Sequence, residues 1–375
     1  MSEYQYYEWQ TVDRLLTEEE EEAISRLSSH IDVSSSRAVV TYSWGDFKHD
    51  PQKVLARFFD AHLYLANWGS RRLMFRFPTG LLNAEVIEPY CVDDSIAFET
   101  ADSFDVLAIE LNEEEGLWVD SEGSLSGLLP LRNDILQGDY RSLYLGWLKA
   151  VSMRGDVAPP ARKGAASKPL EPPVPAGLKQ LSPALKRFLD LFDVDPCLVE
   201  AAAEVSPELV DTPETDFRPL VAQLSRDECD GFLCRMAQGD ATASMELRKR
   251  LLSFVPCQPA KPTARRTVGQ LMNRAKVIED DRARRQKEEA RKKHVAEMEA
   301  LASRETETWQ QAESLVDLKQ PKHYDAAVQL LARLKELSEF RDSPDDFRTR
   351  LVTLCERYRS RPGFQDRVRR AKLLE

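Results

Sequence analysis

Hydrophobic and polar positions divide the chain into a mixed first part and a helical remainder. Within residues 1–155, several short runs alternate apolar and polar side chains with a period of two, which is the spacing of strands. From residue 179 onward, apolar residues recur every three or four positions, which is the spacing of amphipathic helices. The pattern predicts an α+β N-terminal domain, with a mixed or antiparallel sheet and helices, followed by an all-α C-terminal half with one long charged helix.

The long charged helix is predicted over residues 267–317, a stretch with no proline and one glycine. Between Glu279 and Lys293 its only apolar residues are two alanines. A helix that is polar all round commonly spans solvent between two packed regions, and about 50 residues would extend over roughly 75 Å. We favour a single bridging helix. The centre lacks the apolar seam that a coiled coil needs, which is the reason for this preference. An antiparallel coiled-coil hairpin and a bend within the run are the alternatives.

Proline-rich stretches mark the predicted domain boundaries. An α+β domain over residues 1–155 is followed by a Pro/Ala-rich linker over 156–178, which is typical of extended chain. A small helical module is predicted next. A second linker, the long helix and a set of C-terminal helices complete the chain, with the predicted bounds 179–256, 257–266, 267–317 and 318–375.

Charge is distributed unevenly along the 375 residues, whose net charge is −11. Residues 1–157 hold 28 acidic and 13 basic side chains, whereas residues 261–375 hold 20 acidic and 27 basic ones. The acidic N-terminal part disfavours nucleic-acid binding. The basic C-terminal part, over residues 262–375, could bind phosphate or an acidic protein. Mixed charges that keep an exposed helix in solution are the alternative explanation.

The compartment is predicted from what the sequence does not contain. No apolar run has the length of a membrane span, and the first residues lack the pattern of a secretory signal. The six cysteines are scattered and form no CxxC pair. We therefore expect a cytoplasmic chain with reduced thiols and no membrane partner.

Two groups of side chains in the N-terminal domain are candidates for chemistry. Asp60 and His62 lie two positions apart, so on a strand they share one face, as a catalytic base and the group that orients it do. They lie just before a predicted hairpin around residues 67–70. The second group is a basic and aromatic patch that could stack on a base or hold a carboxylate; its members are Trp68, Arg71, Arg72 and Arg76. A structural histidine and arginines paired with local acids are the alternatives.

A third candidate is a basic cluster at the centre of the long helix, which could contact a phosphate backbone. Acidic residues one turn away offer it internal partners instead. The cluster consists of Arg282, Arg284, Arg285, Lys287, Arg291, Lys292 and Lys293. No glycine-rich phosphate loop, zinc-ligand spacing or GxSxG elbow is present, so we predict no cofactor and no metal site, and an enzyme is disfavoured.

The opening YYEWQ, WGDF at residues 44–47 and FDAHLYLANWG at residues 59–69 resemble a bacterial protein family with no assigned activity. The resemblance covers roughly the first 90 residues and transfers no catalytic residue. It implies a bacterial cytoplasmic protein that acts with partners, encoded beside SWIM-type zinc-finger or SNF2-type helicase proteins.

From these features we expect a non-enzymatic adaptor or scaffold subunit that uses the long helix and the C-terminal helices to bind a protein partner. The first alternative is an accessory protein of a helicase or nuclease that binds nucleic acid through its basic C-terminal third. The second is an enzyme with a site near Asp60, His62 and Arg72.

Overall fold

The computed structural model describes residues 4–93, 95–101, 103–112, 125–154, 170–209, 216–240, 242–254 and 266–374. Internal packing divides the chain into two compact units, Met1–Glu279 (unit 1) and Asp280–Glu375 (unit 2). The predicted fold class is confirmed: an antiparallel sheet with helices is followed by a helical C-terminal part. Most of both predicted proline-rich linkers lies outside the described residues.

Unit 1 is built on a seven-stranded antiparallel sheet with the order β2-β3-β1-β4-β5-β7-β6. Its strands are β1 (Gln5–Gln10), β2 (Asp32–Ser34), β3 (Arg37–Tyr42), β4 (Ala61–Ala66), β5 (Ser70–Pro78), β6 (Ile96–Ala101) and β7 (Phe104–Asn112). Its helices are α1 (Glu18–Ser25), α2 (Pro51–Phe58), α3 (Ala84–Ile87), the 3₁₀ helix η1 (Glu88–Tyr90), α4 (Pro130–Leu136), α5 (Arg141–Met153), α6 (Pro183–Phe192), α7 (Pro196–Ala203), α8 (Arg218–Val221), α9 (Arg226–Ala237) and α10 (Ala243–Leu252).

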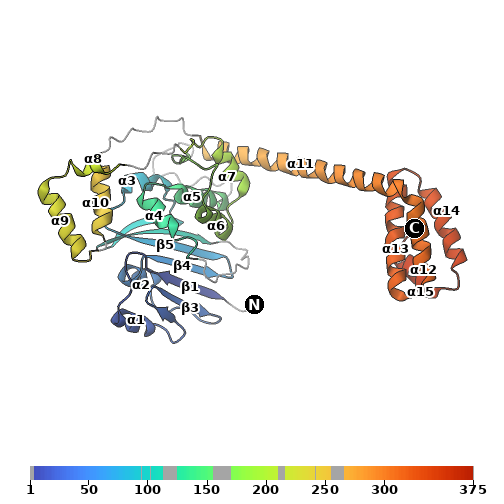
Figure 1. Ribbon diagram of the computed structural model, residues 1–375, viewed down its shortest axis with the longest axis horizontal. Coiled ribbons are helices and arrows are strands. Elements are labelled where there is room, and N and C mark those ends of the chain that lie inside the picture. The colour runs from blue at the N-terminus through green and yellow to red at the C-terminus, as the bar shows by residue number, and fades with distance from the viewer. Residues whose placement is uncertain are drawn as a thin grey trace. The chain divides into compact units, whose positions relative to one another are not determined.

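Helices cover both faces of this sheet (Figure 1). Leu73, Phe75 and Phe77 of β5 pack with α4, α5 and α6 on one face. Met74 of the same strand faces α1 and α2 on the other. The predicted hairpin is present, with Gly69 at a positive φ of 101° between β4 and β5. Because α2 packs on this second face, Arg76 is buried there, whereas Arg72 stays partly exposed.

Helices α6 and α7 belong to the same core as the sheet, although the sequence predicted a separate helical module from residue 179. Leu185, Phe188 and Phe192 of α6 pack in that core, and the two phenylalanine rings stack with centroids 4.5 Å apart. The apolar face of α6 thus finds its partner on α5 rather than within a module of its own. Unit 1 therefore extends beyond the predicted boundary at residue 155.

Two distant segments meet where the long helix begins. The backbone of Glu171 donates to the carbonyl of Arg266 (3.0 Å), and Leu170 pairs with Thr267 in an isolated β-bridge. The Glu171 carboxylate accepts from the Arg266 guanidinium and from the Tyr144 hydroxyl of α5. We call Tyr144, Glu171 and Arg266 the clasp. It ties the start of the long helix to the core of unit 1.

The long charged run is divided into two helices, α11 (Val268–Ser303) and α12 (Glu305–Asp317). Thr267 and Gln270 cap the start of α11 reciprocally. The bend within the run, one of the predicted alternatives, is located at Arg304. It allows Met298 of α11 and Trp309 of α12 to enter one core with the helices that follow.

Unit 2 is completed by α13 (Pro321–Phe340), α14 (Pro344–Arg357) and α15 (Pro362–Arg370). Its core contains the apolar faces that the sequence periodicity predicts on α13 and α14, together with Phe364 and Val368 of α15. In the described part of the chain, no helix is both long and apolar enough to cross a membrane.

The first residues of α11 contribute to the stability of unit 1, because Leu271, Ala275 and Ile278 are buried in its core. A chain that ends at Glu279 is therefore expected to keep the stability of unit 1. A chain that ends at Arg266 is expected to lose roughly 4 kcal/mol or more of unfolding free energy, since it removes two large buried aliphatic side chains. Urea unfolding followed by tryptophan fluorescence measures the difference, and equal midpoints for the two chains would contradict this packing.

Candidate functional site

Asp60 lies directly before β4 and is enclosed by structural partners. Its carboxylate accepts from the Arg76 guanidinium (2.6 Å) and from the backbone N–H groups of Val12 (2.7 Å) and Asp13 (3.0 Å). Burial raises the pKa of the Asp60 carboxyl, but the charges of Arg76 and Arg132 and the two N–H groups more than offset burial and hold this pKa below its ordinary value. Asp60 is thus a structural group that is charged at neutral pH.

His62 is fully buried in the sheet, and its contacts are with other residues than those of Asp60. Its Nδ1 lies 3.0 Å from the carbonyl oxygen of Glu8, and its ring stacks on Trp9 with centroids 4.6 Å apart. Burial lowers the pKa of His62 to about 3, so the ring is neutral at physiological pH. Nε2 has no hydrogen-bond partner among the described residues. The expected pairing of Asp60 with His62 as orienter and base does not form.

The residues of the predicted basic and aromatic patch lie at separate places on the sheet. Arg71 is buried on the face opposite to Arg72 and Arg76, because neighbouring residues of a strand alternate. Arg72 pairs with Glu110 of β7, and Arg76 with Asp60. Trp68 remains 41% exposed in the β4–β5 turn, where its indole donates to Ser70. These four residues therefore form no common surface.

The basic cluster of α11 lies on an exposed stretch of helix. Each of its members is exposed, and so are Glu288 and Glu289 between them. Arg284 donates to Asp281 one turn earlier, at 2.8 Å. Acidic side chains thus lie within about one turn of the basic ones, as the sequence indicated. The members of the cluster are Arg282, Arg284, Arg285, Lys287, Arg291, Lys292 and Lys293.

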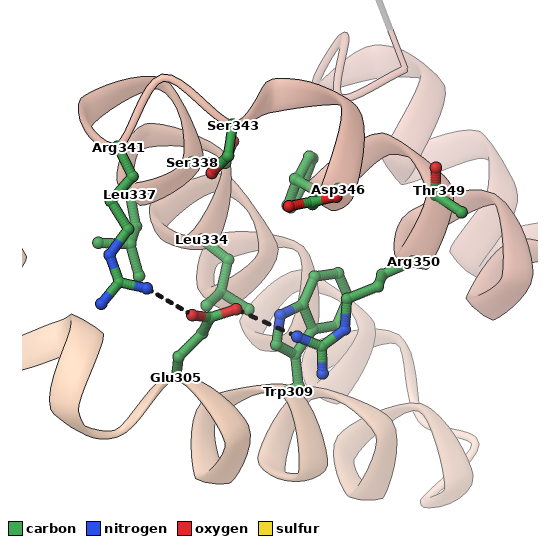
Figure 2. A pocket seen from close by; sticks show the side chains of 11 residues that line it. Glu305, Trp309, Leu334, Leu337, Ser338, Arg341, Ser343, Asp346, Thr349 and Arg350 are labelled. Carbon is green, nitrogen blue, oxygen red and sulfur yellow. Dashed lines mark hydrogen bonds and ion pairs between the residues drawn. The ribbon is translucent and has the colours of Figure 1, made fainter.

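A different arrangement in unit 2 has the form of a binding site. A cavity of about 380 Å³ lies between the start of α12, the end of α13 and the start of α14. We call it the C-terminal cavity (Figure 2). It is lined by Glu305, Trp309, Leu334, Leu337, Ser338, Arg341, Ser343, Asp346, Phe347, Thr349 and Arg350.

Local sequence signals position the three helix ends around this cavity. Helix α13 ends at Phe340, and Asp342 then adopts a φ of 56°, a conformation that Asp tolerates better than most residues. Pro344 occupies the first turn of α14, where its missing N–H is not needed. This tight connection brings Arg341 and the first turns of α14 to the same end of the bundle.

A carboxylate between two guanidinium groups is the central polar feature of the C-terminal cavity. Glu305 accepts from Nη1 of Arg341 (2.9 Å) through one oxygen and from Nη1 of Arg350 (3.1 Å) through the other. The side chains of the two arginines are 46% and 48% exposed. Arg350 also lies over the ring of Trp309, 4.8 Å from its centroid. The three charged groups together carry one net positive charge.

The floor of the C-terminal cavity is apolar. Trp309, Leu334, Leu337 and Phe347 are each at most 5% exposed, and the Trp309 and Phe347 rings contact each other at 5.6 Å between centroids. An apolar floor with a few convergent polar groups is the usual composition of a ligand pocket.

Sequence reasoning identified the floor of the C-terminal cavity but missed its charged groups. The helical periodicity marks Trp309, Leu334, Leu337 and Phe347 as core positions. Glu305, Arg341 and Arg350 are far apart in sequence and resemble any solvated helix residue. No local sequence pattern marks these three residues as members of one site.

Among the described residues, no group of three or more His, Cys, Asp or Glu side chains is placed to hold a metal ion. Comparison with protein-family models, with curated proteins and with solved structures finds no match to this chain.

Proposed function

We propose that this chain is a cytoplasmic, non-enzymatic adaptor whose unit 2 binds a segment of a partner protein. The observation that carries the proposal is the C-terminal cavity, in which Arg341 and Arg350 stand half exposed above a buried aromatic and leucine floor. Arginine and tryptophan beside a desolvated pocket are the residues that most often dominate protein–protein binding energy. Unit 1 would supply the second attachment point, with α11 as the helical connection.

A second candidate function is nucleic-acid binding through the basic cluster of α11. Its support is the exposure of Arg284, Arg285 and Lys287, and of the second basic group at residues 291–293. Glu288 and Glu289 between these two groups oppose it, because they would face the same phosphates. We rank this function below protein binding.

An enzyme site near Asp60, His62 and Arg72 has less support. Asp60 and His62 are 1% and 0% exposed, respectively, and their polar contacts are with the fold itself. Arg72 is paired with Glu110. The described geometry offers this candidate no common space for a substrate.

Purification of the tagged protein from its native host, with nuclease treatment and mass spectrometry, tests the proposal. The full-length chain is expected to retain a stoichiometric protein partner after nuclease treatment. A chain that ends at Glu279 is expected to lose the partner, because it lacks unit 2 while keeping the core of unit 1. Retention of the partner by the shortened chain would contradict the adaptor proposal. Loss of all companions from the full-length chain on nuclease treatment would favour nucleic-acid binding.

A further inference from the structure

The arrangement of Glu305, Arg341 and Arg350 indicates which chemical group the C-terminal cavity recognises. Each arginine donates to Glu305 through one nitrogen only, and neither is paired with another carboxylate among the described residues. A guanidinium has five N–H donors, so each arginine keeps donors for a further acceptor. These remaining N–H donors can be satisfied only by an acceptor, which favours an anion over a cation.

These donors are held in place before any ligand arrives. Stacking on Trp309 limits the rotamers of Arg350, and Trp309 is itself fixed against Phe347. Glu305 holds the ends of both guanidinium groups on one side of the cavity (Figure 2). Less side-chain entropy is lost on binding when the donor geometry is already formed.

The other groups of the cavity decide between kinds of anion. Asp346 also lines the cavity, and it makes no ion pair with the described residues. Together with Asp346, the charged residues that line the cavity sum to zero, so the two carboxylates repel a phosphate with nearly two charges more strongly than a carboxylate with one. Arginine clusters recognise acidic side chains, while chain-terminal carboxylates are commonly held by backbone N–H groups. The leucine floor suits an aliphatic neighbour of the acidic residue.

We propose that the C-terminal cavity binds an acidic side chain of a partner protein, with an aliphatic neighbour packed on Leu334 and Leu337. This inference rests on the proposed function, because it names the chemistry of the partner segment. Arg341 and Arg350 hold the carboxylate, and Glu305 keeps the two guanidinium groups oriented while competing with the ligand for them.

The test titrates N-acetyl-Leu-Glu-Leu amide into the full-length protein and follows the six tryptophan indole N–H signals by NMR. The Trp309 signal is assigned with a Trp309→Phe variant. A saturable shift of this signal in the millimolar range is expected, because one short peptide makes only a few charge-assisted contacts. The matched peptide with Gln in place of Glu is expected to leave the signal unshifted.

Variants separate ligand binding from a purely structural role. Arg341→Gln and Arg350→Gln are each expected to weaken binding of the Glu peptide by about tenfold or more, since each removes a hydrogen bond to a charged group. Glu305→Gln is expected to tighten binding, because the competing carboxylate is lost. Arg357→Gln is the matched control: Arg357 pairs with Glu313 on the same two helices but does not line the cavity.

Three results would overturn the inference. Equal shifts with the Glu and Gln peptides would show that the floor alone binds. An equal response to N-acetyl-Leu-Leu with a free carboxyl end would assign the site to chain termini. No shift of the Trp309 signal with any peptide would contradict the proposed carboxylate site. If the purification still showed a partner that depends on unit 2, the adaptor proposal would remain supported.

Discussion

Replacing Asp60 by alanine is expected to lower the free energy of unfolding by about 3–5 kcal/mol, the usual cost of removing one member of a buried ion pair. The variant leaves the Arg76 guanidinium, whose side chain is 9% exposed, without its carboxylate. It also leaves the N–H groups of Val12 and Asp13 without their acceptor. Arg132 keeps its two bonds to Asp13, so the loss is confined to one half of the network.

Urea unfolding followed by tryptophan fluorescence measures the effect of Asp60→Ala, because only Trp309 of the six tryptophans lies in unit 2. Glu22→Ala is the control. Its exposed pair with Arg26 should contribute less than about 1 kcal/mol. A loss for Asp60→Ala no larger than that of the control would show that the buried network does not stabilise unit 1.

The buried pair of Asp60 and Arg76 predicts that the free energy of unfolding depends on pH. The pKa of Asp60 is lower in the folded state than in the unfolded state, so Asp60 contributes stability that is present above the unfolded-state pKa of about 3.9. That contribution is lost as the pH falls from there through the folded-state pKa. We expect the unfolding free energy of the wild type to fall on acidification over this range, and that of Asp60→Ala to fall less. Parallel decreases would contradict the assignment.

Replacing Glu171 by alanine is expected to have the second largest effect of a single substitution, a loss of about 3–4 kcal/mol of unfolding free energy. Glu171 is 2% exposed and accepts from both the Arg266 guanidinium and the Tyr144 hydroxyl. Its loss would leave the buried Tyr144 hydroxyl without this acceptor and the Arg266 guanidinium with only its bond to the Ala201 carbonyl. Burial and the neighbouring Glu171 carboxylate also raise the pKa of Tyr144, which keeps its hydroxyl protonated as a donor.

Hydrogen exchange locates the effect of Glu171→Ala. Faster exchange is expected in residues 170–178 and in the first turns of α11, because the clasp joins these two segments. Glu204→Ala is the matched control, since it removes a partly exposed pair with Arg274 on the same helix. Unchanged exchange at both segments in Glu171→Ala would show that the clasp does not hold the start of α11.

The sequence predicts those parts of the fold that depend on local patterns. The hairpin at Gly69 and the capped start of α11 at Thr267 follow from residues only a few positions apart. The helices of unit 2 likewise follow from their apolar periodicity. The bend at Arg304 is harder to predict from the sequence, because it depends on whether the apolar residues on both sides of Arg304 pack into one shared core.

The polar networks could not be predicted in the same way. Arg76 is buried because the β4–β5 register pairs Ala61 with Phe75 and so places Asp60 beside Arg76. The C-terminal cavity arises where the ends of three helices meet, and its Glu305, Arg341 and Arg350 are brought together only by the packing of the bundle. Such contacts join residues that are not close in the sequence, so no local pattern of spacing predicts them.

Photo-crosslinking from the edge of the C-terminal cavity tests the adaptor proposal most directly. A benzophenone amino acid replaces Thr349, which is exposed and lines the cavity, in the full-length protein in its native host. The same substitution at Lys322, exposed at the opposite end of α13, is the control. We expect crosslinks from position 349, and not from position 322, to one partner protein at a segment that contains an acidic residue. Equal crosslinking from both positions, or crosslinks to nucleic acid alone, would contradict it.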